Sequence, residues 1–434
     1  MVQAPTTYRG RVVNPLSYND VEDIPSGALV VDDGKIIEYG KFKDIRSRGS
    51  IVDFGDMVII PGLIDTHAHL PQYDMVAMDG CELLEWLDNY IFPAEKRFES
   101  VEVARGAAAR FFEDLKANGT TTSCVYSTVH KDSTDEAFKE AYRSGLRVFM
   151  GKSMMDQNSP PFLQEKTRDS IRSSQELCEK WHGKDEGRLN YVFSPRYAAT
   201  CSMNLMKQVS KLAGRYDALI QTHLSENPHE IRLVKSLFPN YRTYTHIYEA
   251  ANLLTPRTIM AHCIHLENDE MRLLRKYSVK VAHCPSSNFF LKSGLFNINK
   301  MVDAGLDIGL GSDTGGGPSL SMFKEMSNAC NMSKANYMVS RRNLKPIDST
   351  FAFYLATMGG AKVLGLSHNV GNFSIGKQAD FVVLDAAKVD PLRDNRERSA
   401  REILSQITYR GNELTIFATF VRGVKIYERN KSHS

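Results

Sequence analysis

The middle of the chain alternates short apolar segments with helical patterns, and this alternation restricts the fold more than any other feature. Between the apolar segments lie amphipathic stretches such as residues 103–119, "VARGAAARFFEDLKANG". The apolar segments are residues 57–69, 120–127, 147–156, 190–197, 218–226, 258–266, 280–288 and 307–314. Such alternation is typical of a parallel sheet covered by helices, and eight strands are the number in a closed (βα)8 barrel.

The two ends of the chain have a different pattern, with strand-like stretches separated by turn residues. Asp33-Gly34 is a strong hairpin signal in the first end, and Gly423 marks a bend in the second. We therefore expect a small β-sandwich domain built from residues 1–58 and 371–434. Residues 59–370 would form the barrel, which gives an α/β fold: a TIM-like (βα)8 barrel with a small β domain. Within the barrel, a helix over 133–145 is expected to begin with a Ser-x-x-Glu capping box.

Composition excludes several classes of function. The 434 residues are 42% hydrophobic and 24% charged, as in ordinary globular proteins. Lysine plus arginine total 54 against 51 aspartate plus glutamate, so the charge balance does not favour nucleic acid or an anionic membrane as a partner. The seven cysteines contain no Cys-x-x-Cys pair, which argues against a disulfide framework and for reduced thiols in the cytoplasm. We expect no membrane span and a small or neutral substrate.

Polar side chains follow the apolar segments at the points where strands should end. Catalytic groups of a βα barrel come from the carboxyl ends of its strands, so these side chains are the candidates for a site. They are His67 and His69 after the first segment, Arg196 after the fourth, His223 and Glu226 after the fifth, His262 after the sixth, and Asp313 after the eighth. Burying such groups without partners would cost several kcal/mol, a cost that shared coordination removes.

A single metal ion is the favoured explanation of this pattern. His67 and His69 are two positions apart, so on a strand both point to the same face and can reach one ion. Nitrogen and oxygen ligands without a thiolate favour Zn²⁺, and Fe²⁺ would accept the same set. His283 is a weaker candidate, because the proline and serines after it indicate a loop. Lys152 could in principle bridge a second metal, but no extra carboxylates flank it.

Several motifs, taken in this order, resemble those of the amidohydrolase superfamily. They are "PGLIDTHAH", "THLSEN", "MAHCIHL", "AHCPSSN" and "GLGSDTGGG". Within that superfamily the chain is similar to the guanine deaminases. The similarity is carried by "HLPQYD" at 69–74, "LLEWLDNYIFPAEKRF" at 83–98 and "SPRY" at 194–197.

The resemblance implies hydrolysis of guanine to xanthine and ammonia, in purine catabolism, by a homodimeric enzyme with one Zn²⁺ per subunit. The implied metal ligands are His67, His69, His223 and Asp313. The implied catalytic residues are Glu226, His262 and Asp313. The residues implied to face the purine base are Gln72, Arg196 and Tyr197.

The chemistry of guanine deamination agrees with these residue types. A zinc ion lowers the pKa of a bound water from about 15.7 to about 7, which supplies a nucleophile at neutral pH. Asp313 can accept the water proton, and Glu226 can protonate N3 of the base and then the departing amine. His262 would stabilise the new hydroxyl oxygen. Arg196 offers donors to a carbonyl such as O6, and Gln72 offers both a donor and an acceptor to a ring edge.

Two alternatives remain open from the sequence. The same metal set could deaminate another heterocycle, such as cytosine, a triazine or an adenosine derivative, because fold and metal do not determine the substrate. The chain could also be a metal-free barrel that serves as a scaffold or binds a partner protein. An intact set of ligands argues against the scaffold, and metal analysis would distinguish the two.

Overall fold

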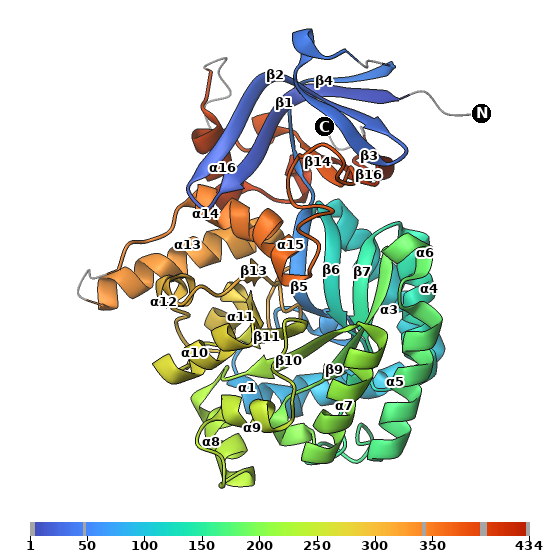
Figure 1. The fold of residues 1–434 in the computed structure, drawn as a ribbon, viewed down its shortest axis with the longest axis vertical. Helices are drawn as coiled ribbons and strands as arrows, with labels where there is room; N and C mark the ends of the chain where they lie inside the picture. The colour runs from blue at the N-terminus through green and yellow to red at the C-terminus, as the bar shows by residue number, and fades with distance from the viewer. Residues whose placement is uncertain (1–4, 47–48, 341–343, 391–396, 431–434) are drawn as a thin grey trace.

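A computed structural model describes residues 5–46, 49–340, 344–390 and 397–430, and its larger part is a parallel barrel (Figure 1). Its strands follow one another in chain order, each parallel to the next. They are β5 (Leu63–His69), β6 (Thr120–Tyr126), β7 (Arg147–Gly151), β9 (Leu189–Pro195), β10 (Leu219–Leu224), β11 (Thr258–His262), β12 (Lys280–His283) and β13 (Ile308–Leu310), with β8 (Ser153–Met154) paired to β9. The amide of Asp313 donates to His67 O at 2.8 Å and links the last strand to the first. The predicted barrel is confirmed.

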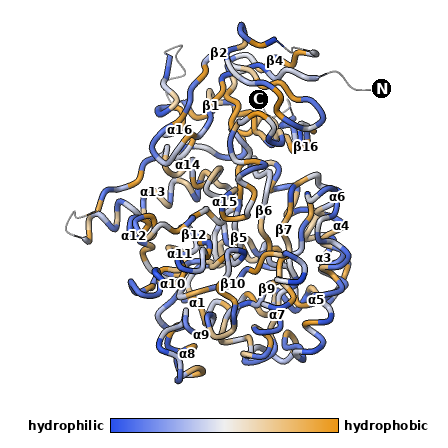
Figure 2. The backbone as a smooth tube through the Cα atoms, viewed as in Figure 1, coloured by the Kyte–Doolittle hydropathy of each residue, from blue (hydrophilic) through white to orange (hydrophobic). Residues whose placement is uncertain are grey.

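Helices of varied length connect the strands and cover the barrel. The longer ones are α3 (Val101–Ala117), α4 (Lys131–Ser144), α5 (Thr167–Trp181), α7 (Met203–Tyr216), α8 (Pro228–Leu237), α10 (Asn268–Lys276), α13 (Met322–Val339) and α16 (Ala400–Arg410). The shorter ones are α1 (Leu83–Trp86), α2 (Phe92–Lys96), α6 (Lys184–Gly187), α9 (Tyr244–Ala250), α11 (Pro285–Phe290), α12 (Ile298–Asp303), α14 (Ser349–Tyr354) and α15 (Gly360–Val363). Hydrophilic residues predominate on outer helices such as α10 (Figure 2). The strands β6 and β7 are buried along their whole length. Within the described ranges, no helix combines the length and apolarity needed to cross a membrane.

The capping box predicted for the helix over 133–145 is wrong. Helix α4 already begins at Lys131, so Ser133 and Glu136 lie inside it. Instead of capping, the Glu136 carboxylate accepts hydrogen bonds from Arg105 Nε and Lys139 Nζ, both at 2.8 Å. Tertiary and helical partners for Glu136 therefore outweigh the local capping interaction that the sequence pattern indicates.

The small domain is built from both ends of the chain, as predicted. Its strands are β1 (Thr6–Ser17), β2 (Asp20–Asp32), β3 (Lys35–Lys41), β4 (Ser50–Pro61), β14 (Phe381–Leu384), β15 (Ile416–Val421) and β16 (Val424–Glu428). They pair in the order β16-β15-β14-β4-β1-β2-β3, and every neighbouring pair is antiparallel except β1 with β4. The predicted turns at Asp33-Gly34 and Gly423 connect β2 to β3 and β15 to β16.

The layers of this domain come from one curled sheet, where the sequence predicted a sandwich. The rings of Tyr8 on β1 and Phe420 on β15 are 5.2 Å apart, although β4 and β14 lie between their strands. A flat sheet would separate them by about 14 Å at 4.8 Å per strand. At the other edge, Ile36 N donates to Lys377 O at 2.8 Å, just before β14. The sheet thus curls around an apolar interior. The predicted boundary residues between the two domains stay a prediction.

The small domain covers the end of the barrel at which the strands begin (Figure 1). Thr419 Oγ1 donates to Lys116 O, in the last turn of α3 just before β6, at 2.8 Å. Arg147, the first residue of β7, forms an ion pair of 2.9 Å with Asp380, and their side chains are 2% and 1% exposed. The opposite end of the barrel, where the strands terminate, is therefore left free for a site.

Candidate active site

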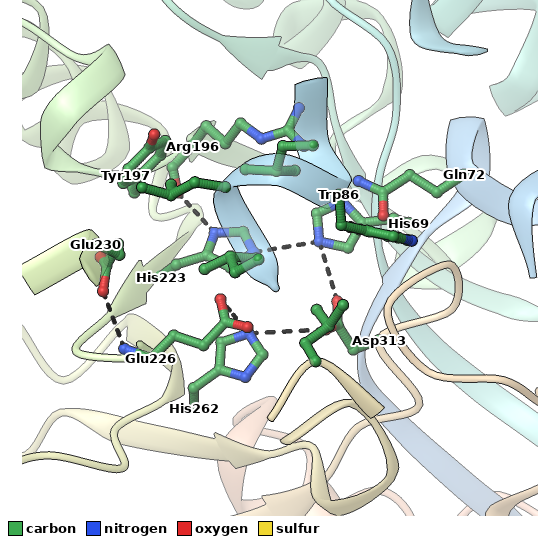
Figure 3. Close-up of a pocket in the computed structure, with 14 residues that line it drawn as sticks. His69, Gln72, Trp86, Arg196, Tyr197, His223, Glu226, Glu230, His262 and Asp313 are labelled. Carbon is green, nitrogen blue, oxygen red and sulfur yellow. Dashed lines mark hydrogen bonds and ion pairs between the residues drawn. The ribbon is translucent and has the colours of Figure 1, made fainter. Parts of the chain in front are cut away.

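Three histidines and an aspartate converge at the carboxyl ends of β5, β10 and β13. Figure 3 shows three of the four, His69, His223 and Asp313, and His67 lies two residues before His69 on β5. Alternation along β5 places His67 and His69 on one face, as predicted. The Nε2 atom of His69 lies 3.2 Å from the Nε2 atoms of both His67 and His223. Asp313 Oδ1 lies 3.2 Å from Nε2 of His67 and 3.3 Å from Nε2 of His69. The four side chains therefore point at a common centre.

The spacing and protonation of this cluster fit a tetrahedral metal ion. Ligand atoms bound at 2.0–2.1 Å around a tetrahedral ion are about 3.3 Å apart, close to the distances between these atoms. The Nδ1–H of His223 donates to Arg196 O at 2.7 Å, so the lone pair of its Nε2 faces the cluster. Burial holds the pKa of His69 and of His223 well below the usual value, which keeps both rings neutral. Neutral nitrogen lone pairs gathered beside a carboxylate are the donor set that a divalent cation binds.

His262 lies beside the cluster and faces two carboxylates. Its Nε2 atom is 3.4 Å from Glu226 Oε2 and 3.7 Å from Asp313 Oδ2, and its Nδ1–H donates to Asn288 Oδ1 at 3.0 Å. Ligand atoms of His67, His223, His262 and Asp313 all lie within 4.8 Å of one another. Burial lowers the pKa of His262, but the charges of Glu226 and Asp313 outweigh it and raise the pKa above its usual value. With Nδ1–H donating to Asn288, the Nε2 atom of His262 is left facing the two carboxylates.

Glu226 points its carboxylate toward His262 and is held from both sides. Its Oε1 accepts from Ser293 Oγ at 3.2 Å, and its backbone amide donates to Glu230 Oε2 at 3.1 Å. The preceding residue, Ser225, has a φ of 50°, a left-handed conformation that turns the chain out of β10. Burial, followed by the negative charge of Asp313, raises the pKa of Glu226. Backbone strain of this kind is common where a side chain must be aimed at a site.

A cavity opens beside the cluster, lined by both polar and apolar side chains. Of the predicted site residues, those lining it are His69, Gln72, Arg196, Tyr197, His223, Glu226, His262 and Asp313. The lining residues that the sequence did not single out are Leu83, Leu84, Trp86, Leu87, Glu230 and Leu291. Leu83, Trp86 and Leu87 are spaced i, i+3, i+4, which is the spacing of residues on one face of a helix. This spacing in the 83–98 segment was the signal that could have identified them from the sequence.

One buried residue beneath the cavity was also missed. Glu95, 3% exposed on α2, accepts hydrogen bonds from both Arg196 and Gln72. Its position within the quoted 83–98 segment was the available signal. His283 and Lys152 lie outside the cluster: the His283 ring stacks on Phe296 at 4.2 Å, and Lys152 pairs with Glu165.

Gly311 leaves room for β5, the strand that carries His67 and His69, and enlarging Gly311 should disturb the cluster. A Cβ atom on Gly311 would lie 2.8 Å from His67 Cβ and 3.1 Å from His67 N. We expect Gly311→Ala to lower the free energy of unfolding by about 1–3 kcal/mol and to weaken metal binding. The measurements are urea unfolding and metal content after dialysis.

The control for this variant is Gly214→Ala in α7. A Cβ there would meet no atom within 4 Å, and alanine in a helix is worth about 0.5–1 kcal/mol over glycine. Gly214→Ala should therefore stabilise the protein slightly and leave its metal content unchanged. Wild-type stability and metal content in Gly311→Ala would show that β5 tolerates the added methyl group.

Comparison with known proteins agrees with this geometry. The amidohydrolase family profile matches residues 58–426. A guanine deaminase of Escherichia coli (strain K12) is 38% identical, with 94% of this chain and 92% of that protein covered. A guanine deaminase of Dictyostelium discoideum is 34% identical, with 96% and 97% covered. The crystal structure of guanine deaminase from C. acetobutylicum with bound guanine in the active site superposes with a TM-score of 0.91 at 33% identity, covering 98% of this chain and 100% of that one. The chain therefore belongs to the amidohydrolase family and is a relative of the guanine deaminases within it.

Proposed function

We propose that this chain is a guanine deaminase, which hydrolyses guanine to xanthine and ammonia in purine catabolism. The observation that carries the proposal is 38% identity over nearly the whole length of the Escherichia coli guanine deaminase. The pocket supports it, because a histidine and carboxylate cluster lies beside the polar groups of Gln72 and Arg196. Identity at this level over both domains favours guanine over cytosine, triazines or adenosine derivatives as the substrate.

We further propose that the resident cofactor is one Zn²⁺ per chain, with Fe²⁺ compatible with the same ligands. The side chains that would hold it are His67, His69, His223 and Asp313. When bound, a divalent metal makes a water molecule nucleophilic at neutral pH. The near-tetrahedral spacing of the four ligand atoms supports this assignment. An intact ligand set also argues against a metal-free scaffold.

The remaining residues have separate tasks in this proposal. Asp313 is placed to accept the proton of the attacking water, because its carboxylate is shared between the ligand cluster and His262. Glu226 gives its proton to N3 of the base, then takes the remaining proton from the oxygen added at C2 and passes it to the departing amine, while the Ser293 hydroxyl holds its carboxylate in place. The water proton accepted by Asp313 restores Glu226 to its protonated form after the product leaves. His262 donates to the oxygen that is added at C2.

The base would lie against the apolar wall formed by Leu83, Trp86 and Leu87. Arg196 and Gln72 would contact the polar edge of the ring, and Tyr197 would border it. The positive charge of Arg196 is balanced by the carboxylate of Glu95, so the pocket is suited to a neutral base rather than an anion. This agrees with the chemistry of guanine, a neutral planar molecule.

Ammonia release from a panel of bases tests the proposed function. Purified protein is incubated with guanine, adenine, cytosine and a triazine, and xanthine is identified among the products. We expect release from guanine, loss of activity after metal is removed with a chelator, and recovery when Zn²⁺ is added. Activity on another base with none on guanine would contradict the substrate, and full activity without metal would contradict the cofactor.

Two assignments rest on resemblance or composition alone. We propose that the enzyme is a homodimer, because the guanine deaminases it resembles are expected to be dimers. We propose a cytoplasmic location from the seven free cysteines, six of them buried. Sedimentation of the purified protein would test the first, and fractionation of cells the second.

A further inference from the structure

Glu95 connects the two polar residues that face the ring edge of the base. Its Oε1 and Oε2 accept from Arg196 Nη1 at 2.8 and 2.7 Å, and Oε1 also accepts from Gln72 Nε2 at 3.1 Å. All three side chains are at least 95% buried. A carboxylate can only accept hydrogen bonds, so it forces the amide nitrogen of Gln72 to face Glu95.

The opposite end of the Gln72 amide is consequently its oxygen, and it stays open. Among the described residues, none donates to Gln72 Oε1, and none accepts from Nη2 or Nε of Arg196. Gly315 adjoins the amide, and a Cβ there would lie 2.6 Å from Gln72 Oε1, so only glycine leaves this oxygen accessible. The Phe92 ring, 5.4 Å from the Arg196 guanidinium carbon, helps to fix the plane of the donors. The pocket thus presents one acceptor next to a set of donors.

We propose that Glu95 is a positioning residue that makes the pocket selective for a lactam edge, an N–H beside a C=O. The inference rests on the proposed function and adds to it the origin of base selectivity. Guanine has such an edge at N1–H and O6, which would meet Gln72 Oε1 and the free donors of Arg196. A base with an amine at position 6 reverses the pattern, because its N1 accepts and its amine donates. Gln72 Oε1 would then face the acceptor N1, and the Arg196 donors would face the donating amine.

The size of the expected preference for guanine follows from the cost of leaving the buried polar groups of Gln72 and Arg196 unpaired when the wrong base binds. Sites built to hydrogen-bond a substrate group reject analogues that lack it by large factors, up to about 10⁴–10⁵. The selectivity holds only while the Gln72 amide cannot rotate by 180°. Without Glu95 the amide could turn its NH₂ group toward the cavity and accept the reversed pattern.

The decisive comparison uses guanine and 2,6-diaminopurine, which carry the same amine at C2 and differ at position 6. For the wild-type enzyme we expect kcat/KM to favour guanine by at least about 10²-fold. Glu95→Leu should reduce this ratio to less than about tenfold, mainly through a raised KM for guanine. Glu95→Gln keeps one acceptor oxygen for Gln72 and Arg196. Its ratio of kcat/KM for guanine over 2,6-diaminopurine should therefore lie between the ratios of the wild type and Glu95→Leu.

Controls separate positioning from folding. Glu136→Gln removes another buried carboxylate, far from the site on α4, and should leave the ratio at the wild-type value. Thermal unfolding and metal content are measured for every variant, and Glu95→Gln decides the question if Glu95→Leu does not fold. Equal losses on both bases, with an unchanged ratio, would overturn the inference. A wild-type enzyme inactive on guanine would overturn the proposed function instead.

Discussion

Replacing Glu226 with glutamine is expected to lower kcat/KM for guanine by about 10²- to 10⁴-fold, the usual range for loss of a general acid–base. Glutamine has the same shape but cannot carry a proton between the base and the departing amine. The carboxylate does not belong to the ligand cluster: its Oε2 lies 3.4 Å from His262 and its Oε1 is held by Ser293. The variant should therefore retain a full complement of metal.

Ser293→Ala is the matched control for Glu226→Gln. It removes the hydroxyl that donates to Glu226 Oε1 at 3.2 Å but leaves the carboxylate itself, so the loss should stay below about tenfold. Steady-state kinetics with guanine and metal analysis of both variants give the comparison. Full activity in Glu226→Gln would remove this residue from the mechanism, and loss of metal would assign it to the ligand set.

Replacing Asp380 with alanine is expected to lower the free energy of unfolding by about 3–5 kcal/mol, because it leaves the buried charge of Arg147 without a counter-charge and with only the amide oxygen of Gln378 as a side-chain acceptor. The pair is 2.9 Å long and almost fully excluded from water. Asp380 Oδ1 also accepts from the backbone amide of Arg422 at 2.8 Å, so the variant loses a second bond of the small domain. Urea unfolding of purified protein measures the change.

An exposed ion pair supplies the control for Asp380→Ala. Arg9 and Asp53 are also 2.9 Å apart, but their side chains are 41% and 46% exposed. Asp53→Ala should change stability by about 1 kcal/mol or less. The double variant Arg147→Met/Asp380→Ala should recover part of the loss, because no buried charge remains unpaired. Equal effects of Asp380→Ala and Asp53→Ala would show that the interface between the two parts does not depend on this pair.

The sequence predicted the barrel and most of the pocket because the relevant signals are local. A buried strand is a short apolar run, and the residue that follows it lies at a known end of a parallel barrel. This is why His67, His223 and Asp313, which are far apart in the chain, could be placed together. The turn at Asp33-Gly34 was equally predictable, because its two residues have φ values of 46° and 71° that few other residue pairs adopt.

Predictions that depended on competition between local and distant partners were less secure. Ser133 and Glu136 have the spacing of a capping box, yet α4 begins at Lys131 and Glu136 pairs with Arg105 from α3. The curl of the small sheet also depends on packing between distant strands, as the contact between Tyr8 and Phe420 shows. Neither outcome can be predicted from the neighbouring residues in the sequence alone.

The sequence by itself determined which residues end the barrel strands and which chemistry they can carry, because strand periodicity and ligand preference are properties of short segments. Only the tertiary structure decided how those residues are oriented. Glu95 lies 23 positions from Gln72 and 101 from Arg196, and its carboxylate bonds to both only after the chain has folded. The direction of the Gln72 amide depends on that buried contact. An amide that can rotate freely would present its oxygen or its NH₂ group to the base equally well.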